Sequence, residues 1–275
     1  MKANGARFDK ISWPAETQNG IRGVVATEDI NSGDYIVSIP RRLMLSVAHA
    51  KEDPELGHIW RNNPSLLRGD TGLALFIMQE KIRGEKSFYW PFLRILPDPY
   101  NLSCWTEQEL LELQDEKLVR RSKSRNKHCR LQYDERTMFE LRLRYPDVYS
   151  TDVYTFELFL YAWRIIQTRA FGKRLPWTAL VPIADCMNHG NVQTKYDFDV
   201  DGNDTFRLFP SGENHYLQGS EVLNSYGRRP NDNLLLEYGF SMMDNQWDEV
   251  EIQCYLRDSD PLFNRKRLAL RANGM

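Results

Sequence analysis

Three short segments decide the fold expected for this chain: Asp185-Cys186-Met187-Asn188-His189, Asn224-Ser225-Tyr226-Gly227 and Glu237-Tyr238-Gly239-Phe240. Alone, each is unremarkable, because an Asn-His pair is common in turns and a tyrosine is common in packed cores. Upstream, residues 19–27 place Gly20 and Gly23 at the entry to a β-rich run. The inference therefore depends on the order and spacing of these elements.

Together these segments resemble the double signature of the SET-domain protein methyltransferases, an Asn-His pair on a loop and a Tyr-Gly turn downstream. Residues 182–189 match P-x-A-D-x-x-N-H and residues 224–240 match N-x-Y-G…N-x-x-L-L-x-x-Y-G-F, the patterns of the Rubisco large-subunit methyltransferase class. The resemblance implies an α+β fold: a β-rich SET core with pseudoknot-like threading of the C-terminal segment, and an inserted α-helical subdomain. It also implies methyl transfer from S-adenosyl-L-methionine to a protein side chain.

We expect four segments along the chain. Residues 1–88 form the N-terminal part of the SET core, residues 89–175 the helical insert, and residues 176–245 the C-terminal part of the core. Residues 246–275 form a terminal strand and a vestigial start of a C-terminal helical domain. Enzymes of the resembled class usually carry that domain, and because the sequence ends at Met275 we expect it to be essentially missing.

Local patterns predict individual elements. Residues 23–27 and 35–39 are β-rich runs around a turn cluster and predict a hairpin, and residues 196–208 predict a second one with its turn near Asp201. Residues 250–256 alternate as one more strand. For helices, Asp70 is the expected N-cap of a helix over residues 73–78. Thr106 and Glu109 are expected to form a capping box at a further helix start. One apolar helix face is expected from Phe156, Phe159, Leu160 and Trp163.

Composition excludes several classes of protein. The 275 residues are 41% hydrophobic and carry a net charge of −2, so no overall field favours nucleic acid or an anionic membrane. The four cysteines, at positions 104, 129, 186 and 254, have no CxxC spacing, which argues against a zinc site and against a disulfide framework. No apolar run reaches membrane-spanning length and no targeting segment is visible. We therefore expect a metal-free, cytoplasmic or nuclear protein, monomeric, without membrane or nucleic-acid partners.

A basic run at residues 120–130 allows two interpretations. Six of its residues are Lys or Arg, and such runs are usually solvated loops because like charges repel. The alternative is a docking patch for an acidic protein partner. Nucleic acid is less favoured because few aromatic residues interleave with the basic ones.

The resemblance also assigns roles to particular residues. Gly20, Arg22 and Gly23 would bring backbone against the cofactor, although family members often carry an acidic residue at position 19 or 20. Arg169, in the S-R-x-F-like element Thr168-Arg169-Ala170-Phe171, would face the cofactor carboxylate. Asp185, Asn188 and His189 would hold the adenine and amino ends of the cofactor, and Phe240 would pack on the cofactor base. Tyr226 would act in catalysis and also contact the cofactor. Thr168 and Tyr238 would line the substrate channel.

The chemistry favours a lysine acceptor without a dedicated base. A lysine ammonium, with an ordinary pKa of about 10.4, must lose a proton before it attacks, and a narrow apolar channel favours the neutral amine. Two alternatives remain open: a protein-histidine methyltransferase of the same fold, and a catalytically silent SET-like module that binds a protein. A Cys186–His189 nucleophile or metal pair is not favoured, because no third activating group lies nearby in sequence.

Overall fold

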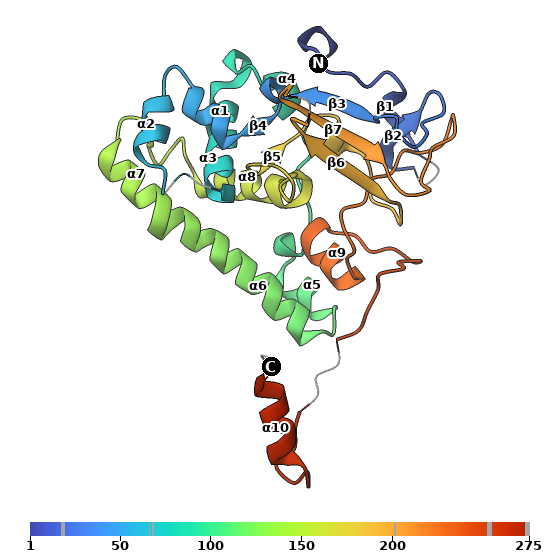
Figure 1. Cartoon of the computed structure of the whole chain (residues 1–275). Coiled ribbons are helices and arrows are strands. Elements are labelled where there is room, and N and C mark those ends of the chain that lie inside the picture. Colours follow the sequence, from blue (N-terminus) through green and yellow to red (C-terminus); the bar gives the residue numbers. More distant parts are fainter. Residues whose placement is uncertain (18–19, 66, 68, 201, 252–254, 273–275) are drawn as a thin grey trace.

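Strands from the two ends of the chain share one sheet. The computed structural model describes residues 1–17, 20–65, 67, 69–200, 202–251 and 255–272. In its three-stranded antiparallel sheet, β3 (Val37–Pro40) pairs with β7 (Thr205–Pro210), which pairs with β6 (Thr194–Phe198). Two smaller antiparallel pairs flank it (Figure 1): β1 (Ile11–Glu16) with β2 (Arg22–Ala26), and β4 (Leu45–Ser46) with β5 (Ala179–Leu180). The fold class is thus α+β, as expected.

The first predicted hairpin is wrong and the second is confirmed. Residues 23–27 and 35–39 do not pair, because β2 pairs with β1 and β3 pairs with β7. Val37 lies opposite Leu208 and Ile39 opposite Phe206, and all four side chains are buried. Pairing two apolar strands decides the register more strongly than a local turn signal does. The β6–β7 pair forms as predicted, and Asp201, the expected turn position, lies outside the described residues.

Eight α-helices lie between β4 and β5, and two more follow β7 in the described part of the chain. They are α1 (Val47–Glu52), α2 (Gly57–Asn62), α3 (Gly69–Arg83), α4 (Trp90–Leu93), α5 (Glu107–Leu111), α6 (Glu116–Leu131), α7 (Phe139–Arg144), α8 (Phe156–Arg169), α9 (Asn231–Tyr238) and α10 (Phe263–Ala272). A π-helical segment, Gln132–Met138, joins α6 and α7 into one long helix that runs along one side of the molecule (Figure 1).

The helical core is built on α3 and α8. Leu73 to Met78 of α3 are all buried, as are Phe159 and Trp163 of α8. Phe156 and Leu160 are half-buried, so the predicted apolar face of α8 forms. Helix α8 ends at Arg169 and so delivers that side chain to the junction with the sheets.

The predicted helix ends are correct in one case of two. Thr106 and Glu109 form the expected capping box, with the Thr106 amide donating to Glu109 Oε2 at 2.7 Å and the Glu109 amide donating to Thr106 Oγ1 at 3.2 Å. Asp70 is not an N-cap, because α3 already begins at Gly69. Its carboxylate instead lies in the first turn of α3, where it interacts favourably with the positive end of the helix dipole.

The basic run lies on helix α6 and is not the solvated loop expected from its charge. Arg121 pairs with Asp232 of α9 (2.6 Å), and Arg125 pairs with Glu237 of α9 (2.8 Å). Two members of the run therefore attach the helical part of the chain to α9. Arg120 and Lys127 are exposed, and within the described residues neither forms an ion pair.

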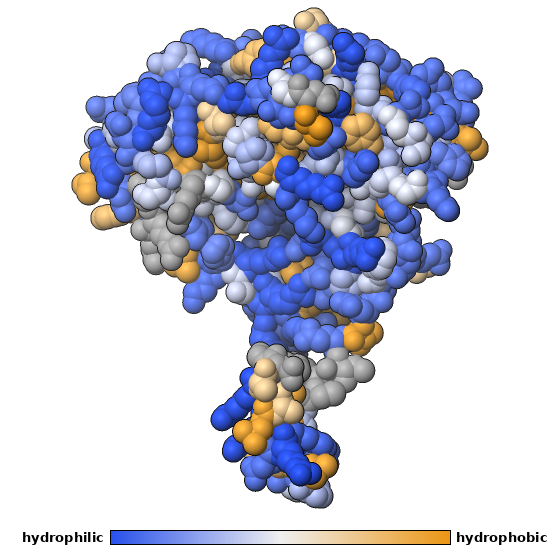
Figure 2. Space-filling view, viewed as in Figure 1, coloured by the Kyte–Doolittle hydropathy of each residue, from blue (hydrophilic) through white to orange (hydrophobic). Residues whose placement is uncertain are grey.

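The C-terminal strand is not formed where the structure describes it. Residues 250–251 and 255–257 are in no strand, and residues 252–254 of that prediction lie outside the described part. Beyond them, α10 lies apart from the rest of the molecule and buries none of its residues (Figures 1 and 2). Figure 2 shows a mostly hydrophilic surface with scattered hydrophobic residues. Among the described residues, no helix combines the length and the apolar character needed to cross a bilayer.

Candidate functional site

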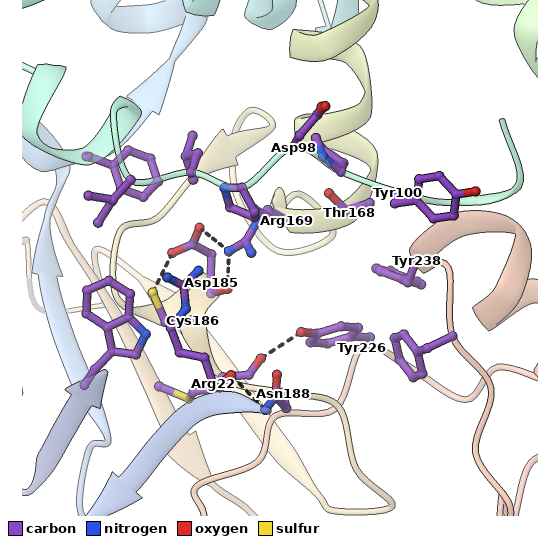
Figure 3. Close-up of a pocket in the computed structure, with 18 residues that line it drawn as sticks. Arg22, Asp98, Tyr100, Thr168, Arg169, Asp185, Cys186, Asn188, Tyr226 and Tyr238 are labelled. Atoms are coloured by element: carbon purple, nitrogen blue, oxygen red, sulfur yellow. Dashed lines mark hydrogen bonds and ion pairs between the residues drawn. The ribbon is translucent and has the colours of Figure 1, made fainter. Parts of the chain in front are cut away.

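Two cavities meet where α8, the segment before β6 and the segment before α9 converge. The first, about 270 Å³, is bounded by Trp13, Arg22, Asp98, Tyr100, Asn188 and Phe240, among others (Figure 3). The second, about 300 Å³, is bounded by Phe171, Lys173, Tyr196, Asn224, Ser225 and Arg229, among others. Both are also lined by Thr168, Arg169, Asp185, Tyr226 and Tyr238. These five residues form a wall common to the two spaces.

Tyr226 is held in this common wall by both its hydroxyl and its backbone. The hydroxyl donates to the Met187 carbonyl at 2.7 Å, and the backbone amide donates to His189 Nδ1 at 3.1 Å. Burial raises the pKa of the Tyr226 hydroxyl, so the phenol stays protonated. Since its proton is used by Met187, its oxygen lone pairs are what the hydroxyl can offer to a ligand.

His189 supports Tyr226 from behind and lines neither cavity. The two rings are stacked with centroids 5.0 Å apart. His189 Nδ1 lies 3.1 Å from the Tyr226 amide nitrogen and 3.2 Å from the Asn224 carbonyl oxygen, whereas Nε2 is buried and has no hydrogen-bond partner among the described residues. Burial lowers the pKa of His189, which keeps the ring neutral. The structure thus places the His189 ring against Tyr226, and a cofactor contact of His189 stays a prediction.

Asp185 and Arg169 form an ion pair inside the common wall. Arg169 Nη1 lies 3.1 Å from Asp185 Oδ2 and donates to the Asp185 carbonyl at 2.9 Å. The Asp185 side chain is fully buried, and this burial raises its pKa even though Arg169 opposes the shift. No hydrogen bond occupies Arg169 Nε or Nη2 in the described part of the chain. The arginine can therefore still receive a carboxylate.

Asn188 lines the other side of the first cavity and lies next to Gly23. Its Nδ2 donates to Glu221 Oε1 at 2.8 Å and to the Arg22 carbonyl at 3.3 Å. A Cβ on Gly23 would lie 2.9 Å from Asn188 Nδ2 and 2.6 Å from Thr17 Cγ2, so a larger residue would displace these side chains. Gly20 has φ +68 with open space around it, and neither glycine lines the cavity.

The Tyr238-Gly239-Phe240 segment completes the wall at the end of α9. Tyr238 packs on Tyr226 with ring centroids 4.9 Å apart, and Phe240 lies 6.1 Å from the His189 ring. Gly239 ends α9 with φ +83, and a Cβ there would lie 1.9 Å from the Tyr100 carbonyl oxygen. The glycine is therefore what lets the loop carrying Tyr100 approach the site.

Cys186 is unsuited to nucleophilic catalysis. Burial and the neighbouring Asp185 carboxylate, to which the thiol donates at 3.6 Å, raise the Cys186 pKa. In the part of the chain that the structure describes, no three His, Cys, Asp or Glu side chains gather as metal ligands would.

The structure assembles the predicted site from distant segments and adds residues that the sequence patterns missed. Arg22, Thr168, Arg169, Asp185, Asn188, Tyr226, Tyr238 and Phe240 all line one or both cavities. The additions are Trp13, Asp98 and Tyr100 in the first cavity and Lys173, Tyr196, Asn224 and Arg229 in the second. Asn224 and Arg229 lie within the quoted motif, and the Pro97-Asp98-Pro99 turn is a visible loop signal.

The curated proteins that are similar in sequence to this chain include several protein N-methyltransferases. No protein-family model matches the chain. The fructose-bisphosphate aldolase lysine N-methyltransferase of Arabidopsis thaliana is 27% identical over 96% of this chain and 55% of that protein. The actin-histidine N-methyltransferase of Xenopus tropicalis is 27% identical over 100% and 47%, and the chloroplastic Rubisco large-subunit N-methyltransferase of Pisum sativum is 27% identical over 92% and 52%. The chain thus spans about half the length of these relatives.

Solved structures agree with the sequence relatives. The SET domain of LSMT bound to lysine and AdoHcy superposes with a TM-score of 0.74, at 23% identity over 100% of this chain and 63% of that one. Rubisco LSMT bound to sinefungin and monomethyllysine superposes with a TM-score of 0.73, at 25% identity over 100% and 62%. The chain therefore has the SET-domain fold and is related to the protein methyltransferases of the Rubisco large-subunit methyltransferase type.

Proposed function

We propose that the protein is an S-adenosyl-L-methionine-dependent protein-lysine N-methyltransferase acting on a non-histone protein. One observation carries the proposal: two cavities share a common wall that contains Tyr226. A methyl donor in the first cavity and an acceptor side chain in the second would meet at that wall, which is the arrangement that in-line transfer requires.

The residues of the first cavity fit the donor. Arg169 has free N–H groups for the carboxylate of the cofactor, and Asn188 Oδ1, which has no partner among the described residues, can accept from its ammonium group. Phe240 offers an aromatic face for the base. When bound, the cofactor supplies an activated methyl group on a sulfonium leaving group.

The residues of the second cavity suit an amine. Phe171, Tyr196, Tyr226 and Tyr238 line it with aromatic rings, which favour the neutral amine by desolvation. The lone pairs of the Tyr226 hydroxyl can accept an N–H of that amine and orient it. The charges of Asp185 and Arg169 neutralise each other, so this buried ion pair adds no net charge to the second cavity.

A histidine acceptor is the second candidate, because the relatives include actin-histidine methyltransferases. An imidazole that attacks with one nitrogen carries an N–H on the other, which needs an acceptor in the channel. Asp185, the one carboxylate among the described lining residues, is already paired with Arg169, so no free carboxylate of that lining receives this N–H, which supports lysine. We further propose a monomer of the cytoplasm or nucleus without a nucleic-acid partner.

The test is methylation of a lysate from the source cells with cofactor labelled in its methyl group, followed by peptide mapping and amino-acid analysis. We expect label in methyllysine of a non-histone protein. Label in methylhistidine would transfer the assignment to the second candidate. Absence of label together with absence of cofactor binding by calorimetry would leave a silent SET-like module.

A further inference from the structure

The wall of the second cavity carries more positively than negatively charged side chains. Its charged lining residues in the described chain are Arg169, Lys173, Asp185 and Arg229. Asp185 is the one carboxylate among them, and it is buried and already paired with Arg169. The positive charges of Lys173 and Arg229 are therefore not neutralised by any described residue of the lining itself.

Arg229 is fixed in position but only partly neutralised. Its Nη1 lies 2.6 Å from Glu237 Oε2, and its Nε donates to the Tyr226 carbonyl at 3.1 Å. Glu237 also pairs with Arg125 at 2.8 Å. One carboxylate thus serves two guanidinium groups, so a positive charge remains beside Tyr226.

Lys173 is presented to the cavity by a closed loop. Phe171 and Ala179 exchange two backbone hydrogen bonds, of 2.8 and 2.9 Å, at the base of that loop. A further bond, from the Leu175 amide to the Gly172 carbonyl at 3.1 Å, tightens the turn. Lys173 is exposed, and within the described chain its ammonium group makes no ion pair. Its charge is therefore available to a ligand at the cavity mouth.

Asn224 adds a neutral donor deeper in the cavity. The residue is 4% exposed. The Thr194 hydroxyl accepts from the Ser225 amide at 3.1 Å, so its proton goes to Asn224 Oδ1, 2.6 Å away. That bond fixes the orientation of the carboxamide and leaves the Nδ2 group without a hydrogen-bond partner among the described residues. This Nδ2 group is not among the buried unpaired atoms of the described residues, so it is open to the cavity and can donate to an acceptor of a ligand there.

We propose that this cavity selects a methyl-acceptor segment with carboxylate side chains next to the target residue. The inference deepens the proposed function and rests on it. Carboxylates of the bound segment would meet Lys173 and Arg229, and a peptide carbonyl would meet Asn224. Basic flanking residues would instead place like charges together, so the same groups reject basic segments.

The probe is a synthetic peptide library with a central lysine and degenerate flanks that lack lysine and cysteine. The full chain, saturated with S-adenosylhomocysteine, is used to capture peptides, and the captured fraction is sequenced. The same library is then methylated with labelled cofactor and the product sequenced. We expect Asp and Glu to be enriched about threefold to tenfold near the lysine.

Lys173→Glu should abolish or reverse this preference. The matched control is Lys51→Glu, which makes the same charge change at an exposed lysine that lines neither cavity. This control should leave the preference unchanged. Asn224→Leu should weaken capture of all peptides alike, provided that its melting temperature shows a folded chain. Captured peptides without acidic enrichment, or a complete failure to capture any, would overturn the inference. The proposed function fails separately, if neither cofactor binding nor methylation is seen.

Discussion

The Tyr226 hydroxyl is the group on which catalysis is expected to depend most. Tyr226→Phe removes its bond to the Met187 carbonyl and its lone pairs while keeping the ring that packs on His189 and Tyr238. We expect kcat on the identified substrate to fall roughly 10²-fold to 10³-fold. Cofactor affinity, measured by calorimetry, should stay within several-fold of the wild type.

Tyr133→Phe is the matched control. Its hydroxyl also donates to a backbone carbonyl, that of Tyr154 at 2.6 Å, but it lies in the helical core and lines neither cavity. That variant should lose stability and keep its turnover. Near-normal turnover of Tyr226→Phe would remove Tyr226 from the mechanism.

Asn188→Ala should have the opposite effect from Tyr226→Phe. The substitution removes the amide that joins Glu221 to the Arg22 carbonyl, and it removes the free Oδ1 on the first cavity. We expect S-adenosylhomocysteine affinity to fall about tenfold or more, with a smaller change in rate at saturating cofactor. Asn214→Ala, which breaks comparable bonds outside both cavities, should change neither. A loss of rate at unchanged affinity would contradict this assignment.

At the scale of single elements, Gly239 joins α9 to the loop that carries Tyr100. Gly239→Ala adds both the strain of a positive φ and a contact of 1.9 Å with the Tyr100 carbonyl oxygen. We expect the free energy of unfolding to fall by at least about 2 kcal/mol in urea denaturation. Gly219 has the same φ of +83 with open space around it, so Gly219→Ala should cost only about 1 kcal/mol. Equal losses would mean that the loop moves aside freely.

Sequence patterns predicted elements well where the signal was local. The β6–β7 hairpin, the Thr106–Glu109 capping box and the apolar face of α8 all follow from side chains a few residues apart. The hairpin expected over residues 23–39 failed because β3 takes its partner from a strand far along the chain. A turn cluster cannot encode such a partner.

The basic run on α6 failed as a loop for the same reason, since Arg121 and Arg125 find their carboxylates on α9, more than a hundred residues away. In the site, the resemblance supplied Arg169, Asn188 and Tyr226, whereas Lys173 and Asp98 enter only through the way their loops fold.

At the scale of the whole molecule, ligand binding should raise thermal stability. S-adenosylmethionine and S-adenosylhomocysteine bind only the folded state, so each should stabilise it by about 2.7 kcal/mol at a hundredfold excess over Kd. The measurement is a melting curve at increasing ligand concentration, with ATP as a control nucleotide that lacks the amino-acid end. No shift at millimolar ligand would favour the silent module.

Chelators should leave the proposed methyltransferase activity intact. The described side chains form no metal-binding group, and the proposed transfer uses desolvation and hydrogen bonds. Methylation in EDTA should therefore match methylation in buffer. Loss of activity in EDTA that zinc restores would overturn the metal-free assignment.

The β3–β7 pairing has a further consequence, for biosynthesis. The sheet cannot form before Val37 can pair with Leu208. The common wall cannot form before the Met187 carbonyl can accept the hydrogen bond of the Tyr226 hydroxyl. Contacts this distant in sequence close late and slowly during folding. We therefore expect a ribosome-bound chain to bind no ligand until residue 240 has emerged. Nascent chains should bind the cofactor in a single step at that length, and a chain cut within the helical segment should yield two inert fragments.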